Sequence, residues 1–144
     1  VDGRVLGRHD GIIHYTIGQR KGIGIGGGVT DDNTPLYVTR LNAADAEVIV
    51  GPKESLARNI VILKNATFTC DVPDRGLTVM VKLRSATKMV KAVIQMQDQN
   101  TTLHLDFPQY GVAPGQAAVC YVDDRCIGGG WIVDATLQDN AQAA

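Results

Sequence analysis

The chain has 144 residues, and its 14 basic and 15 acidic side chains give a formal net charge of −1 at pH 7. This length suits one ordinary domain or two small ones. The balanced charge excludes a global cationic field for nucleic acid, so any such binding must depend on local patches. No apolar run approaches the roughly 20 residues that a membrane helix needs, so we expect no membrane partner.

The first third of the chain is predicted to form a small β-rich domain, residues 1–54. The strands expected in it are residues 12–15, 36–41 and 47–50. A short helical turn is expected around residues 15–21. A brief helical connector is expected at residues 55–58, next to the domain boundary near residue 54.

A segment rich in hydrogen-bond donors precedes the glycine run of this domain. It holds two histidines, Gln19, Arg20 and Lys21, and no acid occurs from Gly11 to Thr30. Such a segment suits an anionic surface, and its glycines allow a backbone to come close to another molecule.

From about residue 60, apolar and polar side chains alternate with the period of two that is typical of half-buried antiparallel strands. Five or six such strands predict a small closed or nearly closed β-barrel in a second domain, residues 55–133. The side chains expected to point inward are Val79, Val81, Leu83, Leu103, Leu105 and Phe107. The predicted fold class is therefore all-β and mainly antiparallel. Residues 134–144 have little apolar content and are expected to form a flexible tail.

A basic segment, residues 76–97, contains no acid. Lys82 and Arg84 are expected on one strand face, with Lys88 and Lys91 after the next turn. Such a face is either a solvated surface or a phosphate-binding surface whose affinity falls with salt. Because aromatic residues do not alternate with these cations, we expect recognition of the backbone and shape of folded RNA.

Gln116 lies in a turn that leads into a strand, after Pro114 and Gly115. Its carboxamide either caps this turn or offers a donor and an acceptor to a base or a 2′-hydroxyl. The residues alone leave both roles open.

The three cysteines of the chain are Cys70, Cys120 and Cys126. The absence of a C-x-x-C pair argues against a disulfide framework or a zinc knuckle and fits a reducing cytoplasm. If Asp123–Asp124 is a two-residue loop, Cys120 pairs with Ile127 and Tyr121 pairs with Cys126. The two thiols would then lie on opposite faces of the sheet and should not form a disulfide.

No metal, nucleotide cofactor or catalytic residue is expected in this chain. His9, His14 and His104 lack the spacing of metal ligands. Residues 22–27 satisfy the G-x-G-x-x-G pattern, but residues 30–35 cannot form the helix that a dinucleotide site needs. Cysteines on apolar strands are usually buried and inert.

Three motifs occur in the order and spacing of a known enzyme family. They are His9-x-Gly11 with Tyr15-Thr-Ile-Gly-Gln-Arg-Lys-Gly-Ile-Gly-Ile-Gly-Gly27, then Val112-Ala-Pro-Gly-Gln-Ala-Ala-Val119, then Cys126-Ile-Gly-Gly-Gly-Trp-Ile132. With these motifs the chain resembles the bacterial tRNA-specific 2-thiouridylases from about Gly7 to Val133. Val1 would lie in the middle of such an enzyme, so we expect a C-terminal fragment made of the central and C-terminal domains.

The resemblance implies a specific chemistry for the longer protein. A nucleotide-binding domain uses ATP and magnesium to adenylate the wobble uridine of certain tRNAs. Two cysteines then deliver sulfur that comes from a persulfide donor protein. The phosphate-binding loop and both cysteines would precede His9, so this chain is expected to be non-catalytic and to help bind tRNA through its anticodon arm.

The resemblance also implies tRNA contacts at matching positions. An Arg-Tyr pair on a barrel strand of the family falls on Arg84-Ser85, and the glutamine of its Pro-Gly-Gln motif falls on Gln116. The family sequence Arg-Tyr-Arg-Gln is Arg84-Ser-Ala-Thr87 here. Lys88 or Lys91 is therefore expected to supply the missing charge.

Arg20 and Lys21 match the family motif fully, and they either contact RNA or brace the domain interface. Two other functions stay open. A stand-alone β-barrel module for a protein or small ligand would show no salt-sensitive tRNA binding. A self-contained enzyme that uses the cysteines would lose its activity on thiol alkylation.

Overall fold

The structure is a computed structural model that describes residues 3–25 and 34–138. The chain divides into two compact units, Val1–Leu56 and Ala57–Ala144, compared with an expected boundary near residue 54. All strand pairs are antiparallel, so the predicted all-β class is confirmed. Within the described ranges, no helix is long and apolar enough to cross a membrane.

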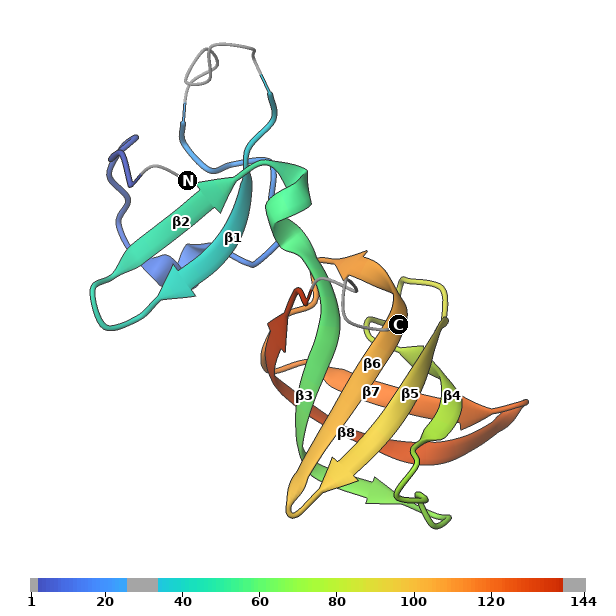
Figure 1. Cartoon of the computed structure of the whole chain (residues 1–144). Coiled ribbons are helices and arrows are strands. Elements are labelled where there is room, and N and C mark those ends of the chain that lie inside the picture. Colours follow the sequence, from blue (N-terminus) through green and yellow to red (C-terminus); the bar gives the residue numbers. More distant parts are fainter. Residues whose placement is uncertain (1–2, 26–33, 139–144) are drawn as a thin grey trace. The chain divides into compact units, whose positions relative to one another are not determined.

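The first unit is built around a hairpin of β1 (Tyr37–Asn42) and β2 (Glu47–Gly51), as expected (Figure 1). Asn42 shapes the turn between the strands: its Oδ1 accepts a bond from Ala44 N at 3.2 Å, and its Nδ2 donates to Asp45 at 2.7 Å. Val38 on β1 is fully buried.

The strand expected at residues 12–15 is wrong, because this segment forms a short 3-10 turn, η1 (Ile12–His14). Its backbone hydrogen bonds are satisfied locally, with Tyr15 N donating to Ile12 O at 3.0 Å. Ile13 is 87% exposed, so the segment has no buried face that a neighbouring strand could cover. A second 3-10 turn, η2 (Lys53–Leu56), lies slightly earlier than the connector expected at residues 55–58.

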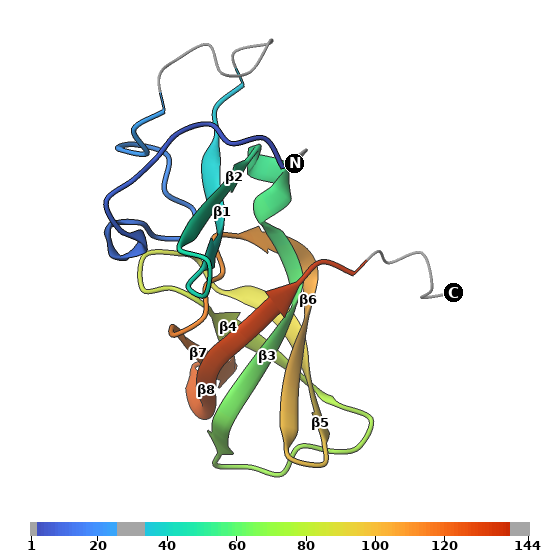
Figure 2. The same cartoon turned by 90° about the vertical axis from the view of Figure 1, so that its left-hand side faces the viewer.

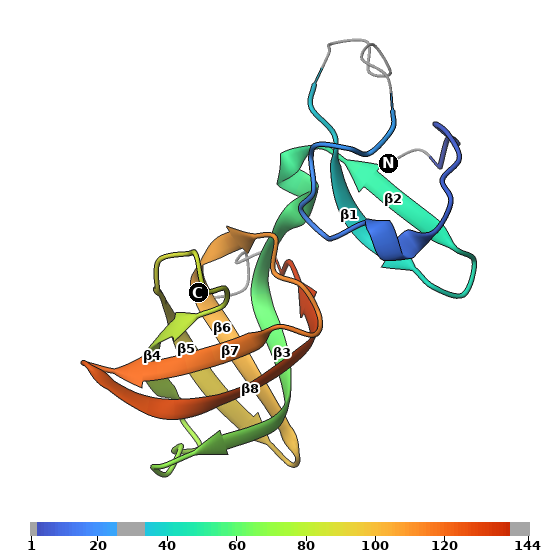
Figure 3. The ribbon, with the colours of Figure 1, turned by 180° about the vertical axis from the view of Figure 1, so that it is seen from behind.

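The second unit is a closed six-stranded barrel with the strand order β3-β6-β5-β4-β7-β8. Figure 1 shows β5 and β6 on its near side, and Figure 3 shows β7 and β8 on the opposite side. The strands are β3 (Ala57–Phe68), β4 (Leu77–Lys82), β5 (Val90–Gln97), β6 (Asn100–Tyr110), β7 (Ala117–Val122) and β8 (Arg125–Thr136).

The interior of the barrel is formed by the alternating apolar side chains. Five of the six residues predicted to point inward are buried: Val79, Val81, Leu83, Leu103 and Leu105. Leu83 and its neighbours belong to one continuous core that also includes Ile94, Cys120 and Ile132. The predicted register of the central strands is therefore confirmed.

Phe107 is the exception, since its side chain is 75% exposed. The pairing of β3 with β6 shifts between Arg58, which pairs with Gln109, and Ile60, which pairs with His104. Phe107 lies in this irregular stretch, where the alternation of faces is broken. Pro108 follows it and has no N–H to donate to a ladder.

Three glycines of β8 bring the strand close to both of its neighbours, β3 and β7. A Cβ at Gly128 would overlap the carbonyl oxygen of Thr67, and a Cβ at Gly129 would overlap that of Ala118. Figure 2 shows β8 beside β3, where the two strands pair. The glycines therefore close the barrel by removing side chains where the backbones meet.

The last strand continues further than the sequence predicts. β8 extends to Thr136, whereas the flexible tail was expected to begin at residue 134. The buried side chain of Asn59 makes two hydrogen bonds to the backbone of Gln138. Its Nδ2 donates to Gln138 O at 2.7 Å, and its Oδ1 accepts a bond from Gln138 N at 2.8 Å. Residues 139–144 of that tail lie outside the described residues.

Candidate functional site

Arg84 and Ser85 lie in the connection between β4 and β5. β4 ends at Lys82, and the backbone then turns. The turn is closed by Thr87, which donates two hydrogen bonds to the carbonyl oxygen of Arg84. The backbone N of Thr87 donates at 3.3 Å, and its Oγ1 donates at 3.1 Å. The expectation that Lys82 and Arg84 share one strand face is therefore wrong. Arg84, Ser85 and Lys88 are all exposed on this connection.

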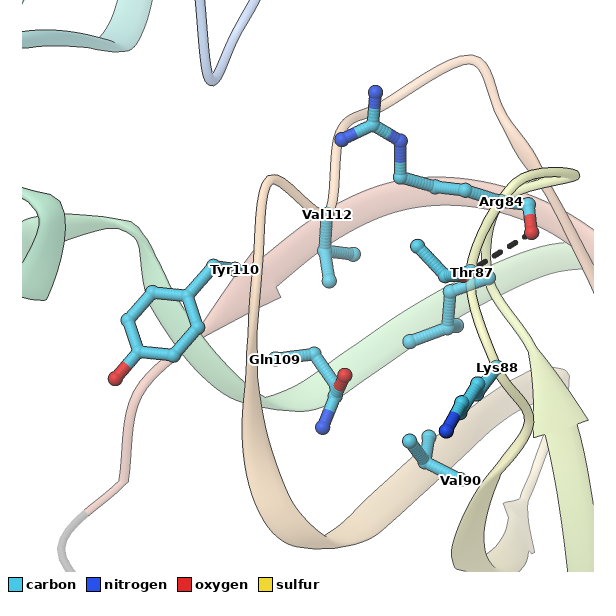
Figure 4. Close-up of a pocket in the computed structure, with 8 residues that line it drawn as sticks. Arg84, Thr87, Lys88, Val90, Gln109, Tyr110 and Val112 are labelled. Carbon is cyan, nitrogen blue, oxygen red and sulfur yellow. Dashed lines mark hydrogen bonds between the residues drawn. The ribbon is translucent and has the colours of Figure 1, made fainter.

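Two of these residues line a pocket at this end of the barrel (Figure 4). The lining residues are Leu83, Arg84, Thr87, Lys88, Val90, Gln109, Tyr110 and Val112. Figure 4 shows the Arg84 guanidinium on the side of Val112 and the Lys88 amine on the side of Val90. The lining has two cations and no carboxylate, so it favours an anionic ligand.

Lys91 differs from Lys88 because its charge is compensated. Its Nζ lies 3.5 Å from a carboxylate oxygen of Asp106 on β6. In the described part of the chain, no carboxylate pairs with Arg84 or Lys88. Of the two lysines expected to supply the missing charge, Lys88 is thus the one without a carboxylate partner in the described residues.

Gln109 and Tyr110 were not singled out from the sequence, yet both line the pocket. Gln109 projects from β6 toward the β4–β5 connection, while the ring of Tyr110 points to the other side of β6 (Figure 4). Tyr110 therefore does not replace the family tyrosine that is serine at position 85. Pro108, which interrupts the β6 ladder, is the one sequence signal that could have drawn attention to this stretch.

Gln116 lies at the start of β7, held by backbone bonds to β8. Gly115 N donates to Ile132 O, and Ile132 N donates to Gln116 O, both at 2.8 Å. The turn is thus closed by backbone groups, and the Oε1 atom of Gln116 is buried without a partner in the described structure. Of the two roles that the sequence left open for Gln116, the capping role is therefore not supported by a hydrogen bond of its side-chain oxygen in the described structure.

The β4–β7 pairing places Gln116 near Arg84 and Ser85. Lys82 pairs with Val119 at the end of β4, so the residues that follow Lys82 and those that precede Val119 lie at the same end of the barrel. The four predicted site residues Arg84, Ser85, Lys88 and Gln116 therefore lie at the same end of the barrel.

Arg20 and Lys21 belong to the first unit, where Gln19 fixes their backbone. Gln19 Oε1 accepts a bond from Thr16 N at 3.0 Å, and its Nε2 donates to Lys21 O at 2.9 Å. The Gln19 carbonyl oxygen also accepts a bond from Val38 N of β1 at 2.9 Å. Gln19 therefore has a positioning role that leaves both cations exposed.

His9 has a structural role in the first unit. His9 Nδ1 accepts a bond from Gly11 N at 3.2 Å, and its ring meets the edge of the Tyr15 ring at 5.3 Å. Over residues 3–25 and 34–138, no three His, Cys, Asp or Glu side chains gather closely enough to hold a metal ion. Part of the G-x-G-x-x-G pattern, from residue 26, lies outside the described residues.

The three cysteines are free thiols: Cys120 is buried, and Cys70 and Cys126 are exposed. Burial, with a smaller contribution from Cys126, raises the pKa of the Cys120 thiol to about 12. Tyr121 pairs with Cys126 as expected, but a register shift pairs Cys120 with Gly128 instead of Ile127. A buried thiol of such high pKa is a poor nucleophile.

Comparisons with known proteins agree with this architecture. Residues 58–132 match the aminomethyltransferase beta-barrel domain, and residues 1–52 match the tRNA methyl transferase PRC-barrel domain. The tRNA-specific 2-thiouridylase MnmA of Rhodospirillum centenum is 50% identical over an alignment of 139 residues, and the match covers 94% of this chain and 36% of that protein. The chain belongs to the tRNA-specific 2-thiouridylase family. Proteins of the same name from Brucella ovis and Brucella abortus are 45% identical over 151 residues, covering 99% of this chain and 37% of theirs.

The family resemblance inferred from the three motifs is thus confirmed, and the chain spans about a third of the length of these 2-thiouridylases. The structure also separates the motifs by what they do. The glycines of Cys126–Ile132 close the barrel, whereas Pro114, Gly115 and Gln116 form a turn that backbone bonds to Ile132 hold at the start of β7.

Proposed function

We propose that this chain is the non-catalytic, tRNA-binding part of a tRNA 2-thiouridylase. The surface that would bind tRNA consists of Arg84, Ser85, Lys88 and Gln116 at one end of the barrel. The observation that carries the proposal is the pair of exposed cations, Arg84 and Lys88, at one pocket without an acidic partner in the described residues. Phosphate groups supply the opposite charge.

The other parts of the proposed function follow from family membership. The relatives named above are tRNA-specific 2-thiouridylases and are nearly three times as long as the matched segment. We assign the ATP, magnesium and persulfide chemistry to the rest of such an enzyme and the contact with the anticodon arm to this chain. Arg20 and Lys21 are further candidates for tRNA contact. The free thiols fit a reducing cytoplasm.

Salt-dependent tRNA binding by the full-length enzyme tests this proposal. Arg84→Ala and Lys88→Ala should each weaken binding and lower the slope of log K against log salt by about one released counterion. Lys91→Ala is the matched control, because Asp106 already neutralises Lys91. If Arg84→Ala and Lys88→Ala behave like Lys91→Ala, this end of the barrel does not bind tRNA.

A further inference from the structure

The pocket lined by Arg84 and Lys88 has a chemical composition that a simple phosphate site does not need. Its two cations lie at opposite ends (Figure 4). The rest of the lining includes apolar side chains, Leu83, Val90 and Val112, and one neutral carboxamide, that of Gln109. The pocket thus combines two separated charges with a largely neutral lining.

The carboxamide of Gln109 is held in place by its own strand. Its Nε2 donates to the carbonyl oxygens of Phe107 at 3.3 Å and Pro108 at 3.2 Å. No described residue hydrogen-bonds its Oε1, so an acceptor is left for a ligand. The irregular pairing of β6 with β3 places Gln109 at the pocket, because Gln109 pairs with Arg58 beyond the register shift.

A nucleic-acid backbone has a matching composition: two separated phosphates joined through a neutral sugar. Arg and Lys bind phosphates by charge and hydrogen bonds. The ribose of RNA adds a 2′-hydroxyl, which is both a donor and an acceptor and distinguishes RNA from DNA. A glutamine carboxamide can donate a hydrogen bond to this hydroxyl or accept one from it, and it adds no charge.

We propose that one nucleotide unit of the tRNA backbone lies across the mouth of this pocket, with its two flanking phosphates on Arg84 and Lys88 and its 2′-hydroxyl on Gln109. The inference rests on the proposed function and adds a residue that reads ribose. An acidic peptide would need only the two cations, whereas the neutral acceptor in the same lining suits a sugar hydroxyl.

The test compares the full-length enzyme with its Gln109→Met variant, which keeps the side-chain length and removes the hydrogen bond. The probes are a tRNA anticodon-arm RNA and a series of the same RNA with single 2′-deoxy substitutions. For the native enzyme, one substitution should weaken binding by roughly three- to tenfold. For Gln109→Met, that same substitution should have no effect. Gln95→Met, an exposed glutamine on β5, is the matched control and should keep the native response.

A second variant guards against a folding defect in the first. Gln109→Glu places a negative charge between the two phosphates, so it should weaken RNA binding more than Gln95→Glu does and lower the salt slope. Equal binding of the RNA arm and its all-DNA counterpart by the native enzyme would overturn the proposal. So would 2′-deoxy effects that are the same in the native enzyme and Gln109→Met.

The outcomes separate this inference from the proposed function. One outcome is that Arg84→Ala and Lys88→Ala weaken tRNA binding while every 2′-deoxy substitution has the same effect on the native enzyme and on Gln109→Met. In that case the pocket binds phosphates without recognising the ribose. If neither cation affects tRNA binding, the proposed function itself fails.

Discussion

The guanidinium of Arg84 lies against the backbone of Gly111, with Nη1 only 2.7 Å from the position that a Cβ at residue 111 would occupy. Gly111 has a φ of +74°, a conformation that favours glycine. It is buried in the connection that leads from β6 to β7. Glycine at this position therefore allows the turn and also leaves room for the side chain of Arg84, a proposed tRNA contact.

Gly111→Ala should displace the Arg84 side chain and weaken tRNA binding without removing a charge. The left-handed backbone should also cost about 1–2 kcal/mol of unfolding free energy. In an Arg84→Ala background, Gly111→Ala should cost the same stability but no further tRNA affinity. Affinity and denaturant unfolding of the four variants in this cycle measure both effects. An additive loss of affinity would show that Gly111 does not act through Arg84.

Gly129→Ala and Gly115→Ala should separate steric overlap from backbone strain. A Cβ at Gly129 would overlap the Ala118 carbonyl oxygen, so the barrel should lose at least about 3 kcal/mol or fail to fold. Gly115 has open space around a Cβ but a φ of +86°, so its replacement should cost only about 1 kcal/mol. Fluorescence of the single tryptophan, Trp131, reports barrel unfolding. Similar losses for the two variants would contradict the closure of the barrel by glycine.

Thiol labelling at pH 8 should modify Cys70 and Cys126 quickly and Cys120 only after unfolding. Cys120 keeps its proton because burial raises its pKa to about 12, against 9.0 in an unfolded chain. Between these values the folded state binds the extra proton, so stability should fall as the pH rises from about 9 to 12. Cys120→Ala should lack this component of the pH dependence, and Cys126→Ser should retain it.

Mass spectrometry of the labelled protein identifies which thiols react. Fast modification of Cys120 in the folded protein would contradict its burial. In the full-length enzyme, replacing all three cysteines should leave thiolation turnover largely intact once stability losses are corrected.

Gln116→Ala should weaken tRNA binding with little change in salt slope, because a glutamine releases no counterion. It should have little effect on barrel stability, since backbone bonds to Ile132 close the turn and the buried Oε1 has no partner. Unfolding curves and tRNA titrations of the variant check the two effects. A large loss of stability with unchanged affinity would identify Gln116 as a cap.

Much of the barrel could be predicted because side-chain alternation is local and reports directly on burial. Val81 and Leu103 follow it and are fully buried. The alternation failed at Phe107, where a shift in pairing breaks the link between position and face. It also failed at residues 12–15, where apolar side chains occur without a neighbouring strand to cover them.

The site could be predicted only in part, for a related reason. Arg84, Lys88 and Gln116 could be predicted from the charge pattern and the family motifs. Gln109 and Gly111 were not, because their proximity to Arg84 depends on how the ring of strands closes. Long-range juxtapositions of this kind have no local sequence signal.

The most direct test of the account is tRNA and ATP binding by the full-length enzyme with the double charge reversal Arg84→Glu and Lys88→Glu. The matched control is Arg75→Glu with Arg125→Glu, which changes the net charge equally at exposed positions near the opposite end of the barrel. We predict at least about a tenfold loss of tRNA affinity for the first pair, a much smaller loss for the control and unchanged ATP binding for both. Equal tRNA affinities for the two double variants would contradict the assignment of tRNA binding to this end of the barrel.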